Sequence, residues 1–404
     1  MPDTTILKRI FDYKSRANPY PLFAELCKTP VSWQEGGPNE NGTWVISTYR
    51  DIAELFHDPR LSSDLRKGAE SGGPRSPLAE YLFISRDPPD HDRMRAMAMR
   101  HFGPPDRPDY VEQLRPKILE ITTSLIDQLQ GEREFDLVAK VSYPLPVAVI
   151  CEILGVPRED QTQFKKWADD LVTSIAFHSS EAASKRDAAS KALAEYISGL
   201  VKLRRQKPGD DLLSKLANDR GPDGFLDERY LAATGTLLLV AGHETTVNLI
   251  TNGMLTLLRH PDILGRLRHE PDLVIGTVEE LLRYEPPVQF LANRTTLQEI
   301  RIGDVTIPKG VLVTMALAAG NRDPDRFEDP DRFDPERPDN GHLGFGSGIH
   351  YCFGAPLARV EAQIALLELA RRLVRPRLLQ DPPPYRESPL LRGPAELRLA
   401  IEGG

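Results

Sequence analysis

The segment FGSGIHYCFG, residues 345–354, places a cysteine among glycines and aromatic residues, two positions after a histidine. A cysteine nucleophile with His350 as its base is disfavoured, because residues two apart diverge on an extended chain and no protease-type signature surrounds Cys352. A dinucleotide-binding loop is excluded, because Tyr351 stands where GxGxxG has its third glycine. Glycines beside a cysteine let the backbone approach a large flat ligand and direct amide N–H groups at the sulfur. The segment therefore favours a thiolate that ligates iron.

A second set of reactive side chains, His243, Glu244 and Thr245, lies within a long apolar run. The first two begin like the zinc-protease motif HExxH, but the fifth residue is Val247, so the second metal ligand is missing. A buried carboxylate beside a hydroxyl is costly unless both are hydrogen-bonded. Either Thr245 bonds a helix carbonyl and Glu244 meets an arginine, or the pair takes part in chemistry. The preceding Gly242 removes a side chain where the helix could open a groove for a ligand.

These side chains need a helix that carries them into the interior. The run DERYLAATGTLLLVAGHETTVNLITNGMLTLLRH predicts a helix from an N-cap at Asp227 to His260, where Pro261 stops it. Its middle is apolar on all sides, which indicates burial within the protein, and its polar residues come too soon for a membrane span.

The segment that follows predicts a shorter helix and a long loop. Within PDLVIGTVEELLRYEPP, Glu280 and Arg283 lie three apart on one face, where an exposed pair contributes only about 0.2–0.5 kcal/mol. Residues 321–340 have no periodicity and are dense in Asp, Pro and Arg. Because Phe327 and Phe333 give this loop apolar side chains to bury, we expect it to be ordered.

The composition excludes several classes of protein. The 404 residues are 40% hydrophobic and 27% charged with a formal net charge of -8, and no Lys/Arg run supplies the basic surface that nucleic acid needs. A small or apolar substrate is more consistent with this composition than nucleic acid. Residues 1–26 lack the apolar stretch of a signal peptide or membrane anchor, so we expect a soluble, cytoplasmic protein. The three cysteines, Cys27, Cys151 and Cys352, are widely spaced, which argues against disulfides and cysteine–zinc sites.

The chain shows no internal repeat and no Gly/Ser linker, so we expect one domain over residues 1–404. Residues 31–47 predict two short strands around a turn, and residues 301–317 predict a similar pair. Residues 115–203 predict several amphipathic helices. The expected fold class is mainly α with small β-sheets.

Residues 345–354 resemble the haem loop FGxGxHxCxG of the cytochrome P-450 (haem-thiolate) monooxygenases. The matching residues are Phe345, Gly346, Gly348, His350, Cys352 and Gly354. The resemblance extends over nearly the whole chain. It implies a cytochrome P-450 fold with a long central helix over a buried haem, haem b as cofactor, and Cys352 as the axial thiolate ligand that favours O–O cleavage.

Other family motifs have counterparts along the chain. The AGxET segment over the haem is matched by Ala241, Gly242, Glu244 and Thr245. The ExxR pair is matched by Glu280 and Arg283, with Arg337 as the third member of a buried network. The residues that neutralise the haem propionates are matched by His91, Arg95, Arg294 and His350.

The resemblance implies a reaction in which one oxygen atom of O2 enters an apolar small molecule by hydroxylation or epoxidation. Glu244 and Thr245, with ordered water, would deliver the protons that O2 activation consumes. The two electrons come from NAD(P)H through a separate ferredoxin and ferredoxin reductase, because the chain shows no flavin or nicotinamide fingerprint. We expect a soluble bacterial-type monomer that acts on a secondary metabolite such as a macrolide or terpenoid, on a steroid, or on a fatty acid.

Three alternatives remain open: a peroxide-driven enzyme, a phenol-coupling enzyme, and a non-catalytic haem carrier or sensor. The retained Glu244–Thr245 pair argues against the first and the third. For the substrate pocket we expect the loop before Asp87, residues near Phe177 and His178, residues 237–241 and residues 288–291.

A docking surface for the electron donor is also predicted. Arg93 and Arg100 lie seven apart, on a helix face roughly opposite to that of His91 and Arg95. We expect these two arginines to form a basic patch that attracts an acidic ferredoxin.

Overall fold

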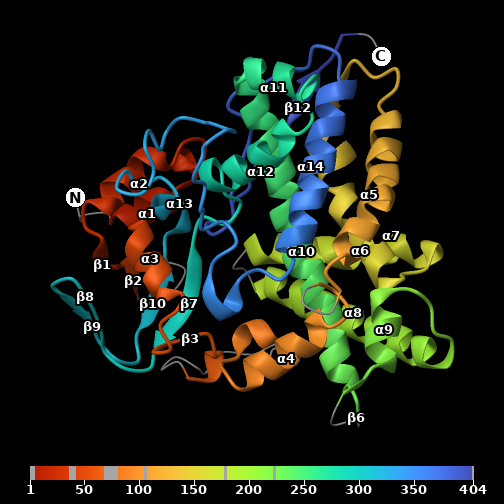
Figure 1. Cartoon of the computed structure of the whole chain (residues 1–404), viewed down its shortest axis with the longest axis horizontal. Helices are drawn as coiled ribbons and strands as arrows, with labels where there is room; N and C mark the ends of the chain where they lie inside the picture. The colour runs from red at the N-terminus through yellow and green to blue at the C-terminus, as the bar shows by residue number, and fades with distance from the viewer. Residues whose placement is uncertain are drawn as a thin grey trace.

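The computed structural model describes residues 5–35, 42–67, 81–103, 107–176, 180–221 and 224–402. Helices dominate and the sheets are small, which confirms the expected fold class. In Figure 1 the long helices form one side of the molecule, and the main sheet with the N-terminal helices forms the other.

Helices account for most of the described chain. Their bounds are α1 (Ile6–Phe11), α2 (Tyr20–Cys27), α3 (Tyr49–Leu55), α4 (Asp90–Met99), α5 (Tyr110–Asp127), α6 (Pro144–Leu154), α7 (Gln161–Ala176), α8 (Ser180–Gln206), α9 (Leu212–Asn218), α10 (Glu228–Arg259), α11 (Pro261–Leu267), α12 (Leu273–Tyr284), α13 (Leu317–Gly320) and α14 (Ala355–Arg372).

The strands are short. Their bounds are β1 (Val31–Gln34), β2 (Thr43–Ile46), β3 (Leu61–Ser62), β4 (Glu134–Asp136), β5 (Arg220–Gly221), β6 (Gly224–Phe225), β7 (Leu291–Thr296), β8 (Ile300–Ile302), β9 (Val305–Ile307), β10 (Leu312–Met315), β11 (Arg377–Leu378) and β12 (Arg398–Ala400).

The main sheet joins strands from residues 31–62 to strands from residues 291–315. Its strand order is β1-β2-β10-β7-β3, with β10 parallel to β2 and the other pairs antiparallel. The predicted strand pair at residues 31–47 is confirmed. Residues 301–317 differ from the prediction, because the β8–β9 hairpin and the separate strand β10 make three strands. Two glycine turns, at Gly303 (φ 56°) and Gly310 (φ 80°), divide this segment where one turn was expected.

The predicted central helix is confirmed as α10. Asp227 caps it by accepting a hydrogen bond from the Arg229 amide at 2.8 Å, and Pro261 begins the next helix one residue after the C-cap. Nearly every residue between Tyr230 and Leu257 is buried, and the helix packs against α6, α8, α12 and α14. It is therefore the element around which the helical side of the molecule assembles.

The loop over residues 321–340 is ordered as predicted. It contains no regular helix or strand, yet Phe327 and Phe333 are both buried. None of the helices in the described ranges combines the length and the apolar composition that crossing a bilayer requires.

Candidate active site

The loop that carries Cys352 depends on glycine at two positions. Gly346 (φ 69°) and Gly348 (φ 67°) adopt left-handed backbone angles that side chains disfavour. A Cβ atom on Gly348 would also lie 2.3 Å from the carbonyl oxygen of Phe56, a contact no other residue could accept. The amide of Cys352 donates to the carbonyl of Phe345 at 3.0 Å, which closes the loop. The sequence pattern is therefore required by the backbone.

Cys352 has a different electrostatic setting from the other two cysteines. It lies two residues before Gly354, the N-cap of α14, so its sulfur lies near a helix N-terminus. Burial raises the pKa of its thiol, while the amides of Gly354 and Ala355 and the guanidinium groups of Arg95 and Arg359 act in the opposite direction.

Cys27 and Cys151 lack such cations. Burial, together with a nearby carboxylate, raises the pKa of Cys27 to about 11 and that of Cys151 to about 12. Of the three cysteines, Cys352 is thus the one whose sulfur faces helix-terminal amides and two guanidinium groups, which oppose the effect of burial on its pKa.

The four predicted propionate-binding side chains converge beside this loop. The rings of His91 and His350 have centroids 4.4 Å apart, and His350 lies within electrostatic range of Arg294 and Arg95. Burial, followed by the charges of Arg294 and His91, lowers the pKa of His350 to about 3, with Asp87 acting in the opposite sense. These groups come from α4, β7 and the haem loop, as the family motifs implied.

Two buried polar atoms in this cluster, Nε2 of His91 and Nδ1 of His350, have no partner within the described parts of the chain. Burial lowers the pKa of Arg294 to about 10, with only Asp87 opposing it. Asp87 itself accepts from Ser62, from the amide of Ser63 and from Lys67. The cluster thus contains histidine nitrogens without partners among the described residues and a buried guanidinium with one opposing carboxylate. A ligand with two carboxylates would provide acceptors for these groups and balance the positive charge. The residues present therefore fit haem.

Arg95 has a second contact that the motif did not indicate. Its Nη2 donates to the carbonyl of Tyr351 at 2.7 Å, and its guanidinium carbon lies 5.8 Å from the centroid of the Phe83 ring. Arg95 therefore reaches the residue directly before Cys352.

On α10 the structure places the predicted acid and hydroxyl next to each other in a buried stretch. Thr245 donates its hydroxyl to the carbonyl of Ala241 at 2.6 Å, while Ala241 itself is exposed, so α10 borders open space at this point. The Thr245 oxygen keeps its lone pairs as acceptors. Glu244 is only 6% exposed, and burial raises its pKa against the opposing charge of Arg386. Both features predicted for a structural role, the carbonyl bond and a facing arginine, are present.

Gly242 lies on the part of α10 that faces α6. A Cβ atom there would lie 3.4 Å from Cδ1 of Ile150, which is an ordinary van der Waals contact. The packing of α10 on α6 therefore does not by itself require glycine at this position. His243 also packs towards α6, with its ring centroid 4.5 Å from that of Tyr143.

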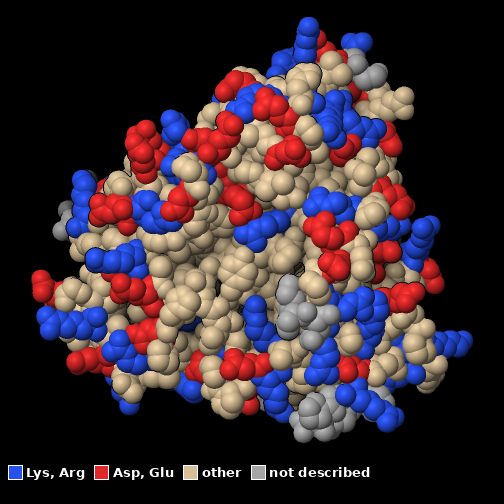
Figure 2. Space-filling model, in the orientation of Figure 1, with Lys and Arg blue, Asp and Glu red and all other residues tan. Residues whose placement is uncertain are grey.

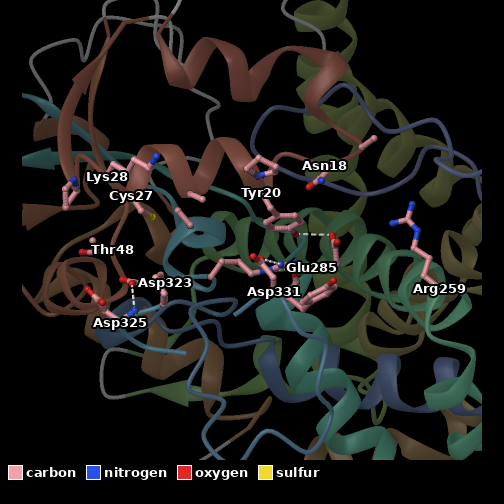
Figure 3. A pocket seen from close by; sticks show the side chains of 18 of the residues that line it. Asn18, Tyr20, Cys27, Lys28, Thr48, Arg259, Glu285, Asp323, Asp325 and Asp331 are labelled. Carbon is pink, nitrogen blue, oxygen red and sulfur yellow. Dashed lines mark hydrogen bonds and ion pairs between the residues drawn. The ribbon is translucent and has the colours of Figure 1, made fainter. Parts of the chain in front are cut away.

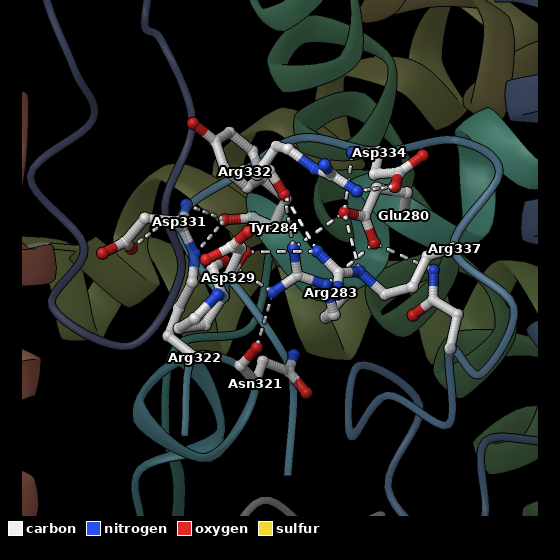
Figure 4. Close-up of polar contacts among 12 residues, drawn as sticks. Glu280, Arg283, Tyr284, Asn321, Arg322, Asp329, Asp331, Arg332, Asp334 and Arg337 are labelled. Carbon is white, nitrogen blue, oxygen red and sulfur yellow. Dashed lines mark hydrogen bonds and ion pairs between the residues drawn. The ribbon is translucent and has the colours of Figure 1, made fainter. Parts of the chain in front are cut away.

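Glu280 and Arg283 form a fully buried ion pair (Figure 4). Both side chains are 0% exposed, and two hydrogen bonds of 2.7 and 2.8 Å join the carboxylate to the guanidinium. Arg337 lies 3.4 Å from Glu280, as predicted for the third member, and Asn340, which the sequence did not indicate, donates to Glu280 at 3.0 Å.

The same pair holds the long loop in place. Arg283 donates to the carbonyls of Asn321 (2.9 Å), Pro330 (2.8 Å) and Arg332 (3.1 Å), and Glu280 accepts from the amide of Asp334 at 2.9 Å. The network therefore fixes α12 to the chain segment that leads into the haem loop.

A cavity of about 870 Å³ lies elsewhere, against α2 and α13 (Figure 3). Tyr20 donates to Glu285 at 3.0 Å in its wall, and Arg322 pairs with Asp331 at 2.6 Å. None of the predicted site residues lines it.

Two further expectations concern the substrate pocket, and the structure bears on one of them. Phe290 packs against Phe11 and Phe23 with ring centroids 5.2 and 5.4 Å away, so within residues 288–291 it belongs to the core and not to a pocket. Phe177 and His178 lie outside the described residues.

The prediction of a basic patch formed by Arg93 and Arg100 is wrong for Arg100. Arg100 forms an ion pair with Asp219 at 2.7 Å, and His101 lies 3.1 Å from the same carboxylate. Arg93 is exposed. A carboxylate distant in sequence therefore already neutralises half of the predicted patch.

Glu361, on α14, is a buried acid that the sequence reasoning missed. Burial raises the pKa of its carboxyl to about 8, and Oε2 has no partner within the described ranges. Its signal in the sequence was a single charge in the apolar run VEAQIALL.

This burial predicts a pH dependence of stability. Because the ordinary pKa is 4.5, the folded protein keeps a proton on Glu361 between about pH 4.5 and 8 that the unfolded chain releases. The stabilisation is complete below pH 4.5 and disappears as the pH rises to 8. Glu361→Gln should therefore flatten the fall of the unfolding free energy over this range, measured by urea denaturation at several pH values. Glu368→Gln, on the same helix but paired with Arg371, is the matched control and should leave the slope unchanged. Equal slopes in Glu361→Gln and the unmodified protein would contradict the assignment.

Comparisons with known proteins agree with this geometry. A family model described as Cytochrome P450 matches residues 4–399. Cytochrome P450 107B1 of Saccharopolyspora erythraea is 43% identical over 362 residues, which are 87% of this chain and 87% of that protein. The monooxygenase PikC of Streptomyces venezuelae is 38% identical over 384 residues, covering 93% of this chain and 89% of PikC.

Solved structures show the same fold. The Bacillus subtilis cytochrome P450 PksS superimposes with a TM-score of 0.89 at 31% identity, over 97% of this chain and 99% of that one. The myxobacterial CYP267B1, solved with myristic acid, gives a TM-score of 0.89 at 39% identity, over 98% and 99% of the two chains. The chain therefore belongs to the cytochrome P450 family, whose members are oxidoreductases that carry haem b on a cysteine thiolate.

Proposed function

We propose that this chain, as one domain over residues 1–404, inserts one oxygen atom of O2 into an apolar small molecule, with Cys352 as the axial ligand of haem b. The observation that carries the proposal is the Cys352 loop beside four convergent side chains, of which His91 and His350 have buried nitrogens without partners among the described residues. Haem held by a cysteine thiolate supplies the activation of O2 and favours cleavage of the O–O bond. The substrate gains one oxygen atom, and the second leaves as water with two protons and two electrons.

The haem would be held from several elements of the chain. The iron ligand is Cys352, and the propionates would be bound by His91, Arg95, Arg294 and His350. The faces of the macrocycle would be covered by Ala241, Phe345, Gly346 and Gly354.

Glu244 and Thr245 would handle the protons of the reaction. A carboxyl with a raised pKa holds a proton nearer to neutral pH and can release it to a neighbouring acceptor. Thr245 is fixed by its bond to Ala241, so its oxygen has a defined position from which to accept a hydrogen bond.

The substrate class is argued from the relatives. Their names include 6-deoxyerythronolide B hydroxylase and vitamin D(3) 25-hydroxylase, and CYP267B1 was solved with a fatty acid. Macrolides, terpenoids or steroids, and fatty acids share a large apolar surface and few charges. We assign the substrate of this chain to that group, as part of secondary metabolism.

The electrons would come from a separate ferredoxin and its reductase. Figure 2 shows a mainly uncharged hollow, bordered by Lys and Arg and also by Asp and Glu side chains, on the face that includes the start of α14. Ile349 and Tyr351 of the haem loop are 47% and 38% exposed, which is unusual for large apolar side chains and suits a contact surface. The expectations of a monomer, of a cytoplasmic location and of no nucleic-acid partner belong to the same proposal.

The direct test is an isotope experiment. Compounds that displace the iron-bound water of the ferric protein in a spectral titration are first selected from macrolide, steroid and fatty-acid panels. Each is then incubated with NADH, a surrogate ferredoxin and its reductase under ¹⁸O₂. The product should carry one ¹⁸O atom. Turnover that needs only hydrogen peroxide would favour the peroxide-driven alternative, and carbon–carbon coupling without oxygen insertion would favour a phenol-coupling enzyme.

The proton pair predicts two distinct variants. Thr245→Ala should still bind substrate and consume NADH, but a larger share of the oxygen should leave as hydrogen peroxide, because the proton is no longer positioned. Glu244→Gln should slow turnover as a whole, by about 10²–10⁴-fold, the range of general acid–base contributions. Product formed per NADH separates the two. A normal product yield in Thr245→Ala would leave the bond to Ala241 as a structural feature only.

A further inference from the structure

Tyr351, the residue directly before Cys352, is held at both of its polar ends. Its carbonyl accepts from Nη2 of Arg95 at 2.7 Å, and its hydroxyl accepts from Nη1 of Arg359 at 3.0 Å. Arg95 belongs to α4 and Arg359 to α14, so side chains from two separate helices donate hydrogen bonds to one residue of the haem loop.

Arg359 is itself fixed from a third helix. Its Nε and Nη2 donate to the two carboxylate oxygens of Glu279, on α12, at 2.7 and 2.9 Å. Burial acts to raise the pKa of Glu279, but hydrogen bonds from His342 and Arg359 lower it to about 2, so it is a carboxylate at neutral pH. A two-point contact of this kind fixes the plane of a guanidinium, which one lysine ammonium cannot do.

The guanidinium also contacts the other side of the haem loop. Its central carbon lies 4.6 Å from the centroid of the Phe345 ring, and the carbonyl of Phe345 is the acceptor of the Cys352 amide. Arg359 therefore touches both residues that hold Cys352: the one that precedes it and the one to which its amide is bonded. The Arg359–Glu279 pair also differs from an ordinary surface ion pair in its burial. The two side chains are only 26% and 25% exposed.

We propose that Arg359, anchored by Glu279, is a positioning residue that fixes the Tyr351–Cys352 backbone and supplies positive charge beside the sulfur. The inference rests on the assignment of Cys352 as the axial ligand. A positive charge near the sulfur favours the reduced iron, because reduction adds a negative charge to the same centre. We call the contacts of Glu279, Arg359 and Tyr351 the clamp. The clamp thus affects the reduction potential of the haem iron and the stability of the bond between the iron and the sulfur.

Four variants separate charge from geometry. Arg359→Met keeps the length but loses charge and donors, whereas Arg359→Lys keeps the charge and loses the two-point contact. Glu279→Gln weakens the anchor, and Tyr351→Phe removes only the hydroxyl. Arg371→Met is the control, since Arg371 lies on the same helix but pairs with Glu368, away from the loop.

Two readouts apply to the haem-loaded protein: the ferric/ferrous reduction potential, and the rate at which the reduced carbon-monoxide complex loses its long-wavelength Soret band. Arg359→Met should shift the potential to more negative values and lose the band several-fold faster. Arg359→Lys and Glu279→Gln should lose the band faster while the potential of Arg359→Lys stays close to the original. Tyr351→Phe should show a smaller acceleration, and Arg371→Met no change.

The outcomes distinguish the clamp from the ligand assignment. An unaltered potential and band lifetime in Arg359→Met would overturn the clamp, provided that Cys352→Ala abolishes the band. A band that survives in Cys352→Ala would instead overturn the ligand assignment itself. Should Arg359→Met fail to bind haem, an unaltered band lifetime in both Arg359→Lys and Tyr351→Phe would also overturn the proposal.

Discussion

Glu280→Ala should give a protein that binds little haem and unfolds at a much lower denaturant concentration than the unmodified chain. The substitution leaves Arg283, which is 0% exposed, without its carboxylate partner. Removing one partner of a buried ion pair costs about 3–5 kcal/mol. The amide of Asp334 and the side chains of Arg337 and Asn340 lose their acceptor as well. Because whole proteins are stable by only about 5–15 kcal/mol, this loss is a large share of the total.

The loss can be measured by urea denaturation and by the ratio of haem to protein after purification. Glu270→Ala is the matched control, because Glu270 also pairs with an arginine, Arg266 at 2.7 Å, but on the surface of the protein. Exposed pairs of this kind contribute little, so the control should fold and bind haem normally. A stable, haem-replete Glu280→Ala protein would show that the network around Arg283 is not needed for the fold.

The features that the sequence predicted well are those with local causes. The central helix was predictable because an N-cap, a proline stop and an apolar run all lie within residues 227–261. The haem loop was predictable because positive φ angles at Gly346 and Gly348 demand glycine, and that demand leaves a visible pattern. The pairing of Glu280 with Arg283 follows from their spacing of three on one helix.

The features that the sequence did not predict depend on residues far apart in the chain. The parallel pairing of β10 with β2 joins Val313 to Trp44, and nothing in either strand specifies the other. In the same way, Arg100 looked like a free cation until the structure placed Asp219 beside it. The neighbour of Gly242, Ile150 on α6, was likewise not visible in the sequence, because it depends on how two helices pack.

The clamp on Tyr351 combines both situations. Glu279 stands next to Glu280, and Arg359 follows Cys352 by seven residues, so both lie close to the recognised motifs but outside them. Neither residue predicts the other, since their contact depends on how α12 packs against α14. The sequence therefore indicated the haem loop but not what holds it.

The assignment of Cys352 as the thiolate ligand is the central claim, and the reduced carbon-monoxide spectrum tests it most directly. Cys352→Ala should abolish the long-wavelength Soret band, because a thiolate opposite carbon monoxide is its cause, and Cys352→His should give a band at shorter wavelength. Cys27→Ser and Cys151→Ser should keep the band, since neither thiol has a cation near it that would favour its charged form. Among the three cysteines, only Cys352 should remove the band when it is substituted. A long-wavelength band of full intensity in Cys352→Ala would contradict it.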